Sequence, residues 1–313
     1  MADGGTGGPS PVVSVVLPTR NRPDSLQRAV ASVLGQTRRD WELVVVDDAS
    51  DERTRSLLPA VVTGDPRIRL LHHEARRGGG AARNTGIEAA RGPWVAFLDD
   101  DAEWRPDKLA LQLDRVATAE GATLAYGPVL AVDESGEASV VGGPVPERNA
   151  FEVLARGNRI DTSGVMVDRA TLLGVGGFDP ALPRLQDWDL WLRLVPGARL
   201  VYAESPLART YRVGRRISTD PPALRLAAER LAEKHASSAA LLATLGHMLL
   251  AEGESEPGRA LLDRAWSLEP GPGLGLRRLL ARLSPTAYRA LSLASARRRP
   301  AAAAGDWPGG SDE

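Results

Sequence analysis

Short apolar runs and polar segments follow one another along the N-terminal third of the chain. Four segments are expected to form strands: residues 12–18, 41–46, 67–73 and 94–98. The first, second and fourth have the length and apolar character of strands that are buried on both faces. Between the first two, residues 24–34 have apolar positions at helical spacing, with Leu34 on the apolar face. Because Asp24 and Gln27 have the spacing of a capping box, we expect this helix to begin at Asp24 and to end at Gly35.

The repeated order of strand and helix predicts an α/β fold in which a largely parallel sheet is flanked by helices. In such a sheet the ligand-binding crevice lies beyond the carboxyl ends of the strands. Polar clusters stand at those ends, in the segment TRNRP after the first run and the segment DDAS after the second. We therefore expect the binding site at this edge of the sheet.

Three consecutive aspartates, Asp99, Asp100 and Asp101, follow the fourth apolar run. Because successive side chains of an extended chain point to opposite sides, Asp99 and Asp101 are expected to face one way and Asp100 the other. Two carboxylates at about 4 Å repel each other by roughly 4 kcal/mol at an effective dielectric constant of about 20, which favours a cation between them. A hydrated divalent ion with a phosphate-bearing substrate is one interpretation. A solvated acidic turn that caps the next helix is the other.

The second half of the chain has a different pattern. Residues 122–141 indicate two strands around the turn DESGE, and residues 185–194 indicate an amphipathic helix. Beyond Asp220 the apolar spacing is helical. These changes predict four parts: a disordered leader at 1–10, an α/β domain at 11–220, a helical C-terminal region at 221–300 and a disordered tail at 301–313.

Two basic amphipathic stretches, 275–283 and 287–299, lie in the helical region and are separated by Pro285. One interpretation packs them against the main domain with their arginines in water. The other attaches them to an anionic membrane surface, so that peripheral membrane contact stays open.

Composition narrows the function classes. The formal net charge of -1 argues against a nucleic-acid partner. The chain has no cysteine, which excludes disulfides, thiolate metal sites and cysteine nucleophiles. The start, MADGGTGGPSP, lacks the basic and apolar regions of a signal peptide, and no apolar run approaches the roughly 18 residues of a membrane span. The expected location is the cytoplasm.

A glycine-rich segment, RRGGGAARNTGIEAARG at residues 76–92, reads as a loop that runs into a helix. The dinucleotide fingerprint G-x-G-x-x-G does not fit it, because with Gly78 and Gly80 as the first two glycines the third position is Arg83. Glycines before a helix can still offer backbone N–H groups to a diphosphate, and Arg83 would add a fixed positive charge. A flexible surface loop is the alternative.

Five motifs occur in order along residues 12–218: VSVVLPTRNRPDSLQRAVASVLGQT, WELVVVDDAS, GGGAARNTGIEAARGPWVAFLDDDAEWRPDKL, GGFDP and QDWDLWLRL. Together they strongly resemble the inverting family-2 glycosyltransferases with the GT-A fold. The resemblance implies a metal-dependent enzyme that moves a sugar from a nucleotide diphosphosugar, with UDP favoured, to an acceptor hydroxyl by single displacement. It leaves the acceptor open among glycans, lipid carriers, small molecules and peptides.

The resemblance also implies roles for individual residues. It makes Asp187 the base that takes the acceptor's proton, and Asp101 of the DxD element the ligand of Mn²⁺ or Mg²⁺. Asp99 or Asp100 would hold the ribose. The other donor-binding residues would be Thr19, Arg20 and Arg22 after the first strand, Asp48 against the nucleotide base, and Arg83 near the diphosphate.

Two positions depart from the family pattern. Gln186 stands where many relatives have an acidic residue, which removes a like charge that would raise the pKa of Asp187. Together with a helix N-terminus at this point, the amide predicts a weaker base that is ionised at neutral pH. Gly214 stands where relatives often have a histidine. Nearby arginines would then contact the diphosphate instead: Arg212, Arg215 or Arg216.

These departures motivate a hypothesis from another class, a catalytically silent protein of the same fold that recruits a partner through its nucleotide pocket or its C-terminal helices. A nucleotidyltransferase of related fold is disfavoured, because the glycine-rich segment is not at the first strand. The sequence decides neither the donor sugar nor the oligomeric state.

Overall fold

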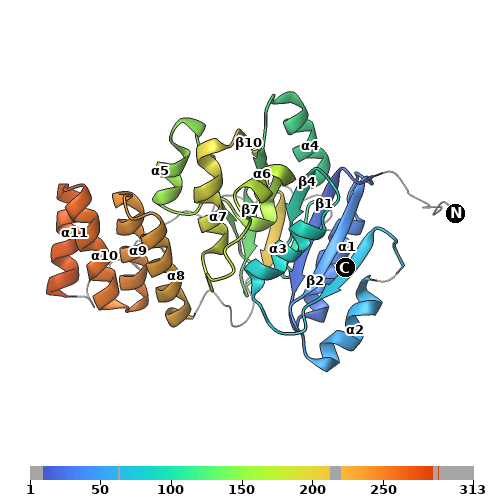
Figure 1. Cartoon of the computed structure of the whole chain (residues 1–313), viewed down its shortest axis with the longest axis horizontal. Coiled ribbons are helices and arrows are strands. Elements are labelled where there is room, and N and C mark those ends of the chain that lie inside the picture. Colours follow the sequence, from blue (N-terminus) through green and yellow to red (C-terminus); the bar gives the residue numbers. More distant parts are fainter. Residues whose placement is uncertain (1–9, 63, 212–219, 285–287, 289–313) are drawn as a thin grey trace.

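The computed structural model describes residues 10–62, 64–211, 220–284 and 288 (Figure 1). The first part of the chain forms these elements: β1 (Val13–Thr19), α1 (Pro23–Leu34), β2 (Trp41–Asp47), α2 (Glu52–Val62), β3 (Ile68–His72), α3 (Gly79–Ala89), β4 (Trp94–Phe97), β5 (Ala102–Trp104) and α4 (Lys108–Thr118). The middle part forms these: β6 (Leu124–Tyr126), β7 (Val129–Val132), β8 (Ala138–Val141), the 3-10 turn η1 (Glu147–Asn149), α5 (Ala150–Ala155), the 3-10 turn η2 (Thr162–Gly164), β9 (Val165–Asp168), α6 (Arg169–Gly174), α7 (Gln186–Leu194), the 3-10 turn η3 (Val195–Gly197), β10 (Leu200–Tyr202) and β11 (Ala208–Tyr211). The C-terminal helices are α8 (Pro221–Lys234), α9 (Ala239–Glu252), α10 (Ser255–Leu268) and α11 (Pro272–Leu283).

The main sheet has seven strands in the order β10-β6-β9-β4-β1-β2-β3. Its central pairs, β1 with β2, β1 with β4 and β2 with β3, are parallel, and β9 runs antiparallel between β4 and β6. A second sheet of four strands has the order β5-β11-β7-β8. The predicted α/β class with a largely parallel central sheet and flanking helices is thus confirmed.

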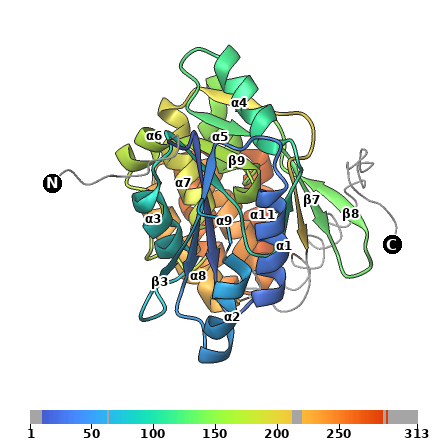
Figure 2. The same ribbon diagram turned by 90° about the vertical axis from the view of Figure 1, so that its right-hand side faces the viewer.

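Side chains of β1 alternate between the two faces of the sheet, as the pleat of a strand requires. Val15 and Leu17 pack with Leu26 of α1 on one face, whereas Val16 packs with Ile87 of α3 on the other. Figure 2 shows the sheet between these helices. Because both faces are covered, β1, β2 and β4 are apolar along most of their length, which is the pattern that identified them.

Two expectations about element boundaries were wrong. α1 begins at Pro23, one residue before the expected start, and no side chain caps it. Leu34 at its end is 38% exposed and lies outside the core. In the segment 122–141, the two strands expected around the turn DESGE are present as β7 and β8. A third strand, β6, was not expected; it belongs to the main sheet, which the chain leaves before β7.

The C-terminal helices share a core with the α/β part. Apolar side chains of α8, α9 and α10 belong to the same cluster as Trp188 of α7 and Leu154 of α5. The backbones of α9 and α10 come close where two glycines face each other, since a Cβ on Gly246 would stand 2.8 Å from the carbonyl oxygen of Gly258. In Figure 1 the helices lie side by side, with α11 outermost.

None of the helices within residues 10–62, 64–211 and 220–284 reaches the length and apolar content needed to cross a bilayer.

Candidate functional site

A cavity of about 490 Å³ lies beyond the carboxyl ends of β1, β2 and β4, at the edge where the sequence predicts it. The chain builds it from the loop after β1, the loop after β2, the start of α3 and the turn after β4. Most of the predicted donor-binding residues line it: Thr19, Arg20, Arg22, Asp48, Arg83, Asp99, Asp100 and Asp101. The remaining residues that line this donor cavity are Pro18, Arg76, Gly78, Gly79, Ala82 and Thr210.

The three aspartates do not alternate in direction as expected for an extended chain. Arg22 Nη1 donates to Asp100 Oδ1 and to Asp101 Oδ2, both at 3.1 Å, so these two share one cation. Asp99 turns instead to Arg83. The expectation failed because β4 ends at Phe97 and the aspartates lie in a turn, closed by a hydrogen bond from Ala102 N to Asp99 O. Extended-chain alternation does not apply in a turn.

Asp100 is the most deeply buried of the three, at 8% exposure. Thr19 Oγ1 donates to its Oδ2 at 2.9 Å. Burial raises the pKa of Asp100 to about 6, against the attraction of Arg22. The turn therefore concentrates negative charge at the cavity wall. The arginines that contact it balance only part of this charge.

Asp48 organises the floor of the cavity. Its carboxylate accepts hydrogen bonds from Arg77 N at 2.7 Å and Gly78 N at 2.8 Å, and it joins His73 Nδ1 at 2.8 Å. Burial acts to raise the pKa of Asp48, but these hydrogen bonds outweigh it and hold the pKa below its ordinary value. Gly78 has φ +90°, a conformation that glycine adopts without strain, and it caps α3. Asp48 thus holds the glycine-rich segment in place for the helix start.

Arg83 connects the donor cavity to the start of α7. Its Nη2 donates to Asp99 Oδ1 at 2.5 Å, and its Nη1 donates to Gln186 Oε1 at 3.4 Å. Burial acts to lower the pKa of Arg83, but the Asp99 carboxylate holds it above the ordinary value. Within the described part of the chain, the buried Nε of Arg83 has no hydrogen-bond partner. This donor suits an anionic oxygen of a ligand.

Asp187 lies in the first turn of α7 and does not line the donor cavity. Asn158 Nδ2 donates to its Oδ2 at 2.8 Å. Burial raises the pKa of Asp187, although Trp188 N and the Arg83 charge oppose the shift. The sequence predicted a lowered pKa and hence a weaker base, and this direction is wrong. The sequence indicated the helix N-terminus and the missing acidic neighbour, but it did not reveal that Asp187 is buried.

Asp161 was missed by the sequence analysis. It precedes η2, and its Oδ1 accepts a hydrogen bond from Ser163 N at 2.9 Å. Burial, followed by repulsion from Asp99, Asp187 and Asp101, raises the pKa of Asp161 to about 7. Asn158, the partner of Asp187, was also missed. No local motif marks either residue. They come near the site only because the segment before β9 is carried there when β9 pairs with β4 in the sheet.

Backbone strain is concentrated at the loops of this site. Within the described ranges, three residues other than glycine have positive φ: Asn21, Ala49 and Leu185, at 56°, 56° and 59°. Asn21 and Ala49 lie in the loops after β1 and β2, and Leu185 immediately precedes Gln186. Such conformations cost on the order of 1–3 kcal/mol and are typical of sites where geometry matters more than stability.

The donor set fits a hard divalent cation. Among the described residues, no group of three or more His, Asp or Glu side chains forms a ready metal site. Asp101, with 30% of its side chain exposed, supplies a carboxylate at the cavity, and Asp99 and Asp100 flank it. Mg²⁺ is commonly held by one or two carboxylates together with substrate phosphates and water. The residues therefore fit a metal that arrives with a diphosphate.

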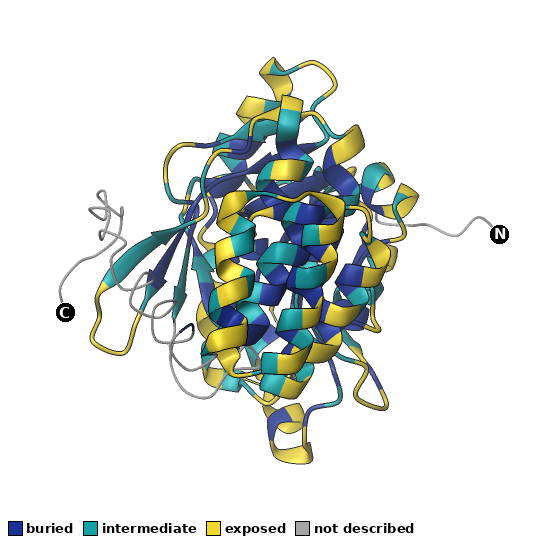
Figure 3. Ribbon diagram, turned by 90° about the vertical axis from the view of Figure 1, so that its left-hand side faces the viewer, coloured by how far each residue is buried: buried dark blue, intermediate teal, exposed yellow. Residues whose placement is uncertain are grey.

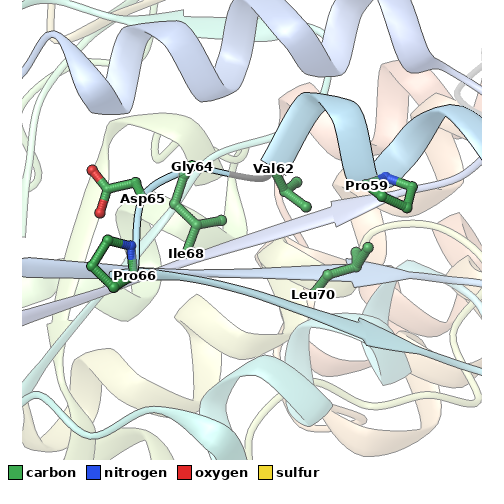
Figure 4. Close-up of a pocket in the computed structure, with 7 residues that line it drawn as sticks. All are labelled: Pro59, Val62, Gly64, Asp65, Pro66, Ile68 and Leu70. Atoms are coloured by element: carbon green, nitrogen blue, oxygen red, sulfur yellow. The ribbon is translucent and has the colours of Figure 1, made fainter.

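A second recess, of about 440 Å³, lies between α2 and β3 (Figure 4). Its lining is mainly apolar: Pro59, Val62, Gly64, Asp65, Pro66, Ile68 and Leu70. Asp65 is already paired with Arg67 at 2.6 Å. This recess offers no group for catalysis.

Three other predicted contacts of the diphosphate, Arg212, Arg215 and Arg216, lie outside the described residues.

Residues 14–154 match the model of the family described as Glycosyl transferase family 2. A relative from Escherichia coli, UDP-Glc:alpha-D-GlcNAc-diphosphoundecaprenol beta-1,3-glucosyltransferase WfgD, is 33% identical over 185 residues, which are 59% of this chain and 70% of the relative. The chain belongs to glycosyl transferase family 2. It is a glycosyltransferase with a nucleotide-sugar site, and nothing among the described residues favours the silent binding protein.

Solved structures show the same fold over most of the chain. S. aureus TarS 1-349, determined in complex with UDP-GlcNAc, aligns with a TM-score of 0.62 at 17% identity and covers 91% of both chains. The mannosyltransferase PcManGT from Pyrobaculum calidifontis, in complex with GDP-Man and Mn2+, aligns with a TM-score of 0.58 at 19% identity over 92% of this chain and 84% of its own. Both matches support the GT-A fold predicted for this chain.

Proposed function

We propose that this glycosyltransferase is metal-dependent and inverting, and that it transfers a sugar from a UDP-sugar to an acceptor hydroxyl by single displacement. One observation carries the proposal. Arg83 contacts Asp99 of the donor cavity on one side and Gln186, the neighbour of Asp187, on the other. Asp187 therefore stands beside the donor cavity but outside it, where an acceptor can approach the sugar from the face opposite the nucleotide.

In this reaction Asp187 accepts the proton of the acceptor hydroxyl while that oxygen forms a bond to C1 of the sugar. The bond from C1 to the diphosphate oxygen breaks, its electron pair leaves with the nucleoside diphosphate, and the configuration at C1 inverts. Burial supports Asp187 in this role, because the raised pKa gives the carboxylate more affinity for a proton. Asn158 orients the carboxylate through its hydrogen bond to Oδ2.

Negative charge develops on the departing diphosphate, so groups that contact it act mainly in the transition state. We assign this contact to Arg83 and to backbone N–H groups at the start of α3. Asp101 would hold Mn²⁺ or Mg²⁺, which would supply Lewis-acid stabilisation of the leaving diphosphate, and Asp99 or Asp100 would hold the ribose. Thr19, Arg20, Arg22 and Asp48 are assigned to the nucleotide.

The comparisons support UDP as the nucleotide, since WfgD is named for UDP-Glc and TarS was solved with UDP-GlcNAc. GDP is the competitor to test, because the archaeal mannosyltransferase was solved with GDP-Man. For the acceptor, the name of WfgD favours a sugar carried on a lipid diphosphate. Asp161 and Asn158, which lie near Asp187 but not in the donor cavity, are assigned to the acceptor side.

The first experiment measures thermal unfolding with UDP, GDP or dTDP, each with and without Mn²⁺. A ligand at about 100 times its Kd adds about 2.7 kcal/mol, a Tm shift of about 4 °C for a protein of this size. We expect the largest shift with UDP and Mn²⁺, and we expect Asp101→Ala to abolish it. Asp114→Ala, which removes an exposed carboxylate on α4, is the matched control and should shift like the wild type.

Turnover tests the chemistry separately. UDP-sugars are incubated with GlcNAc diphosphate carried on a short alkyl chain, and the anomeric configuration of the product is determined by NMR. Asp187→Asn should retain the UDP-dependent Tm shift and lose transfer by about 10³-fold or more. Full transfer by Asp187→Asn would refute the assigned base, and a product with retained configuration would refute single displacement.

A further inference from the structure

The outermost helix, α11, exposes an apolar stripe. Leu276, Leu279 and Leu283 are 58%, 52% and 73% exposed. Their spacing of three and four residues places them on one face of the helix. Figure 3 looks onto this end of the molecule, where exposed positions, in yellow, alternate with buried ones along the helices. Scattered single leucines are ordinary at a surface, but three in a row on one helix face are not.

Two of the three arginines of α11 turn the other way. Arg278 Nε and Arg282 Nη2 both reach Asp263 of α10, at 2.6 Å and 2.8 Å. Arg278 also lies over the Trp266 ring, 5.0 Å from its centre. A helix that lies on a globular protein normally turns its apolar stripe inward and its charges outward. α11 does pack apolar residues inward, at Leu274, Leu280 and Ala281. Two of its charges are nevertheless turned inward as well, and the three exposed leucines are left for a partner outside the protein.

Charge is strongly segregated along the sequence in and after this helix. Residues 271–305 contain seven arginines and no lysine, aspartate or glutamate. The rest of the chain holds 32 basic and 40 acidic residues, so it is net acidic. The excess of positive charge therefore coincides in sequence with the exposed leucines. A partner of α11 must offer apolar contact and negative charge together.

We propose that α11 docks on an anionic phospholipid surface, with Leu276, Leu279 and Leu283 inserted among the acyl chains and with Arg277, the exposed α11 arginine that does not contact Asp263, at the headgroups. Amphipathic helices bind in this way through buried apolar area plus attraction to anionic lipids. A second copy of the chain fits the surface less well, because a two-fold pairing of α11 would bring identical arginine-rich segments together. The proposal does not depend on the donor nucleotide or on the reaction mechanism.

The test is flotation of the full chain with vesicles, without nucleotide or metal. We expect binding to vesicles of phosphatidylglycerol and phosphatidylcholine in equal parts, and little binding to phosphatidylcholine alone. Raising the salt concentration should weaken the interaction, since each basic residue near an anionic surface contributes about fivefold to affinity at low salt. Changing Leu276, Leu279 and Leu283 together to Gln should weaken binding about tenfold or more.

A matched control separates the stripe from general surface hydrophobicity. Leu57 of α2, Leu173 of α6 and Leu226 of α8 are 45%, 45% and 42% exposed on other helices. Their triple change to Gln should leave vesicle binding unchanged. Unfolding curves of both triple variants confirm that each is folded.

Three outcomes would overturn the proposal. The wild type could fail to float with anionic vesicles. The two triple variants could bind equally well. Light scattering could show a wild-type dimer that the α11 triple variant converts to a monomer, which would make the leucine stripe a contact between copies of the chain.

Discussion

Arg83 Nη2 lies 2.5 Å from Asp99 Oδ1, and this ion pair joins the glycine-rich start of α3 to the turn after β4. The two residues are only partly exposed, at 14% and 31% of their side chains. Because Arg83 also contacts Gln186, one guanidinium links three segments that are distant in sequence. Its planar fork is suited to contacts in several directions, which a lysine ammonium on a flexible stem does not reproduce.

Arg83→Lys is therefore expected to lower kcat/KM by about 10²-fold or more, the usual effect of losing one donor that stabilises transition-state charge. Steady-state kinetics with a UDP-sugar would measure it. Arg169→Lys is the control, because Arg169 donates to the carbonyl oxygens of Ile87 and Glu88 outside the donor cavity. Equal losses in the two variants would show that Arg83 has no special role at the donor.

Asp187 should determine the acid side of the pH profile. Burial raises its pKa, and a base must be ionised to accept a proton, so activity should fall with decreasing pH at a higher pH than an ordinary aspartate near 3.9 would produce. The profile of kcat/KM against pH measures this. In Asn158→Ala the carboxylate loses a hydrogen bond that favours its charged form, so the acid limb should move to still higher pH. An unchanged limb would contradict this assignment.

Asp161 should weaken the fold at alkaline pH. Its pKa is about 7 in the folded protein and about 3.9 when unfolded, so between these values the folded state binds the proton more tightly. Stability contributed by this group is present below pH 4 and is lost as pH rises through 7. Asp161→Asn removes the repulsion by Asp99, Asp187 and Asp101, and should raise Tm more at pH 8 than at pH 5.

The measurement is thermal unfolding at both pH values in a chelator, so that no bound cation changes the local charge. Asp168→Asn is the control, because Asp168 accepts a hydrogen bond from Thr171 N as the cap of α6, away from the carboxylates of the site. Its effect should be the same at pH 5 and pH 8. A pH-independent effect of Asp161→Asn would contradict the prediction.

Lys234 should contribute to stability through a buried partner. Its Nζ lies 3.0 Å from Asp189 Oδ1, and Asp189 is fully buried in α7 and also paired with Arg193. Lys234→Met removes this charge-assisted hydrogen bond to a buried carboxylate together with the ion pair between Lys234 and Asp179, so the free energy of unfolding should fall by about 1.5–3 kcal/mol. Denaturant unfolding measures it.

The control for Lys234 is an exposed ion pair in the same helix. Arg225 lies 4.0 Å from Glu254, with half of the arginine side chain in solvent. Arg225→Met should change the free energy of unfolding by less than about 0.5 kcal/mol. Equal effects of the two substitutions would show that α8 is not held in place through Asp189 and Asp179.

The sequence by itself determined the strands, the edge of the sheet that carries the site and most residues of the donor cavity. These follow from local patterns: apolar runs specify strands buried on both faces, and parallel strands bring their carboxyl ends to one edge. The family motifs located Asp187 and the aspartate turn in the same way. Where the local conformation departed from a regular strand, as at Asp99, the sequence prediction was wrong.

Only the tertiary structure decided which of these side chains are buried and which residues they contact. Asp161 gains its raised pKa because β9 lies beside β4, and Asp187 gains its own because α7 is covered by other elements. The outward direction of the α11 leucines likewise depends on where α10 lies. Desolvation and contact depend on which distant segments meet, and a one-dimensional pattern of polar and apolar residues does not contain that information.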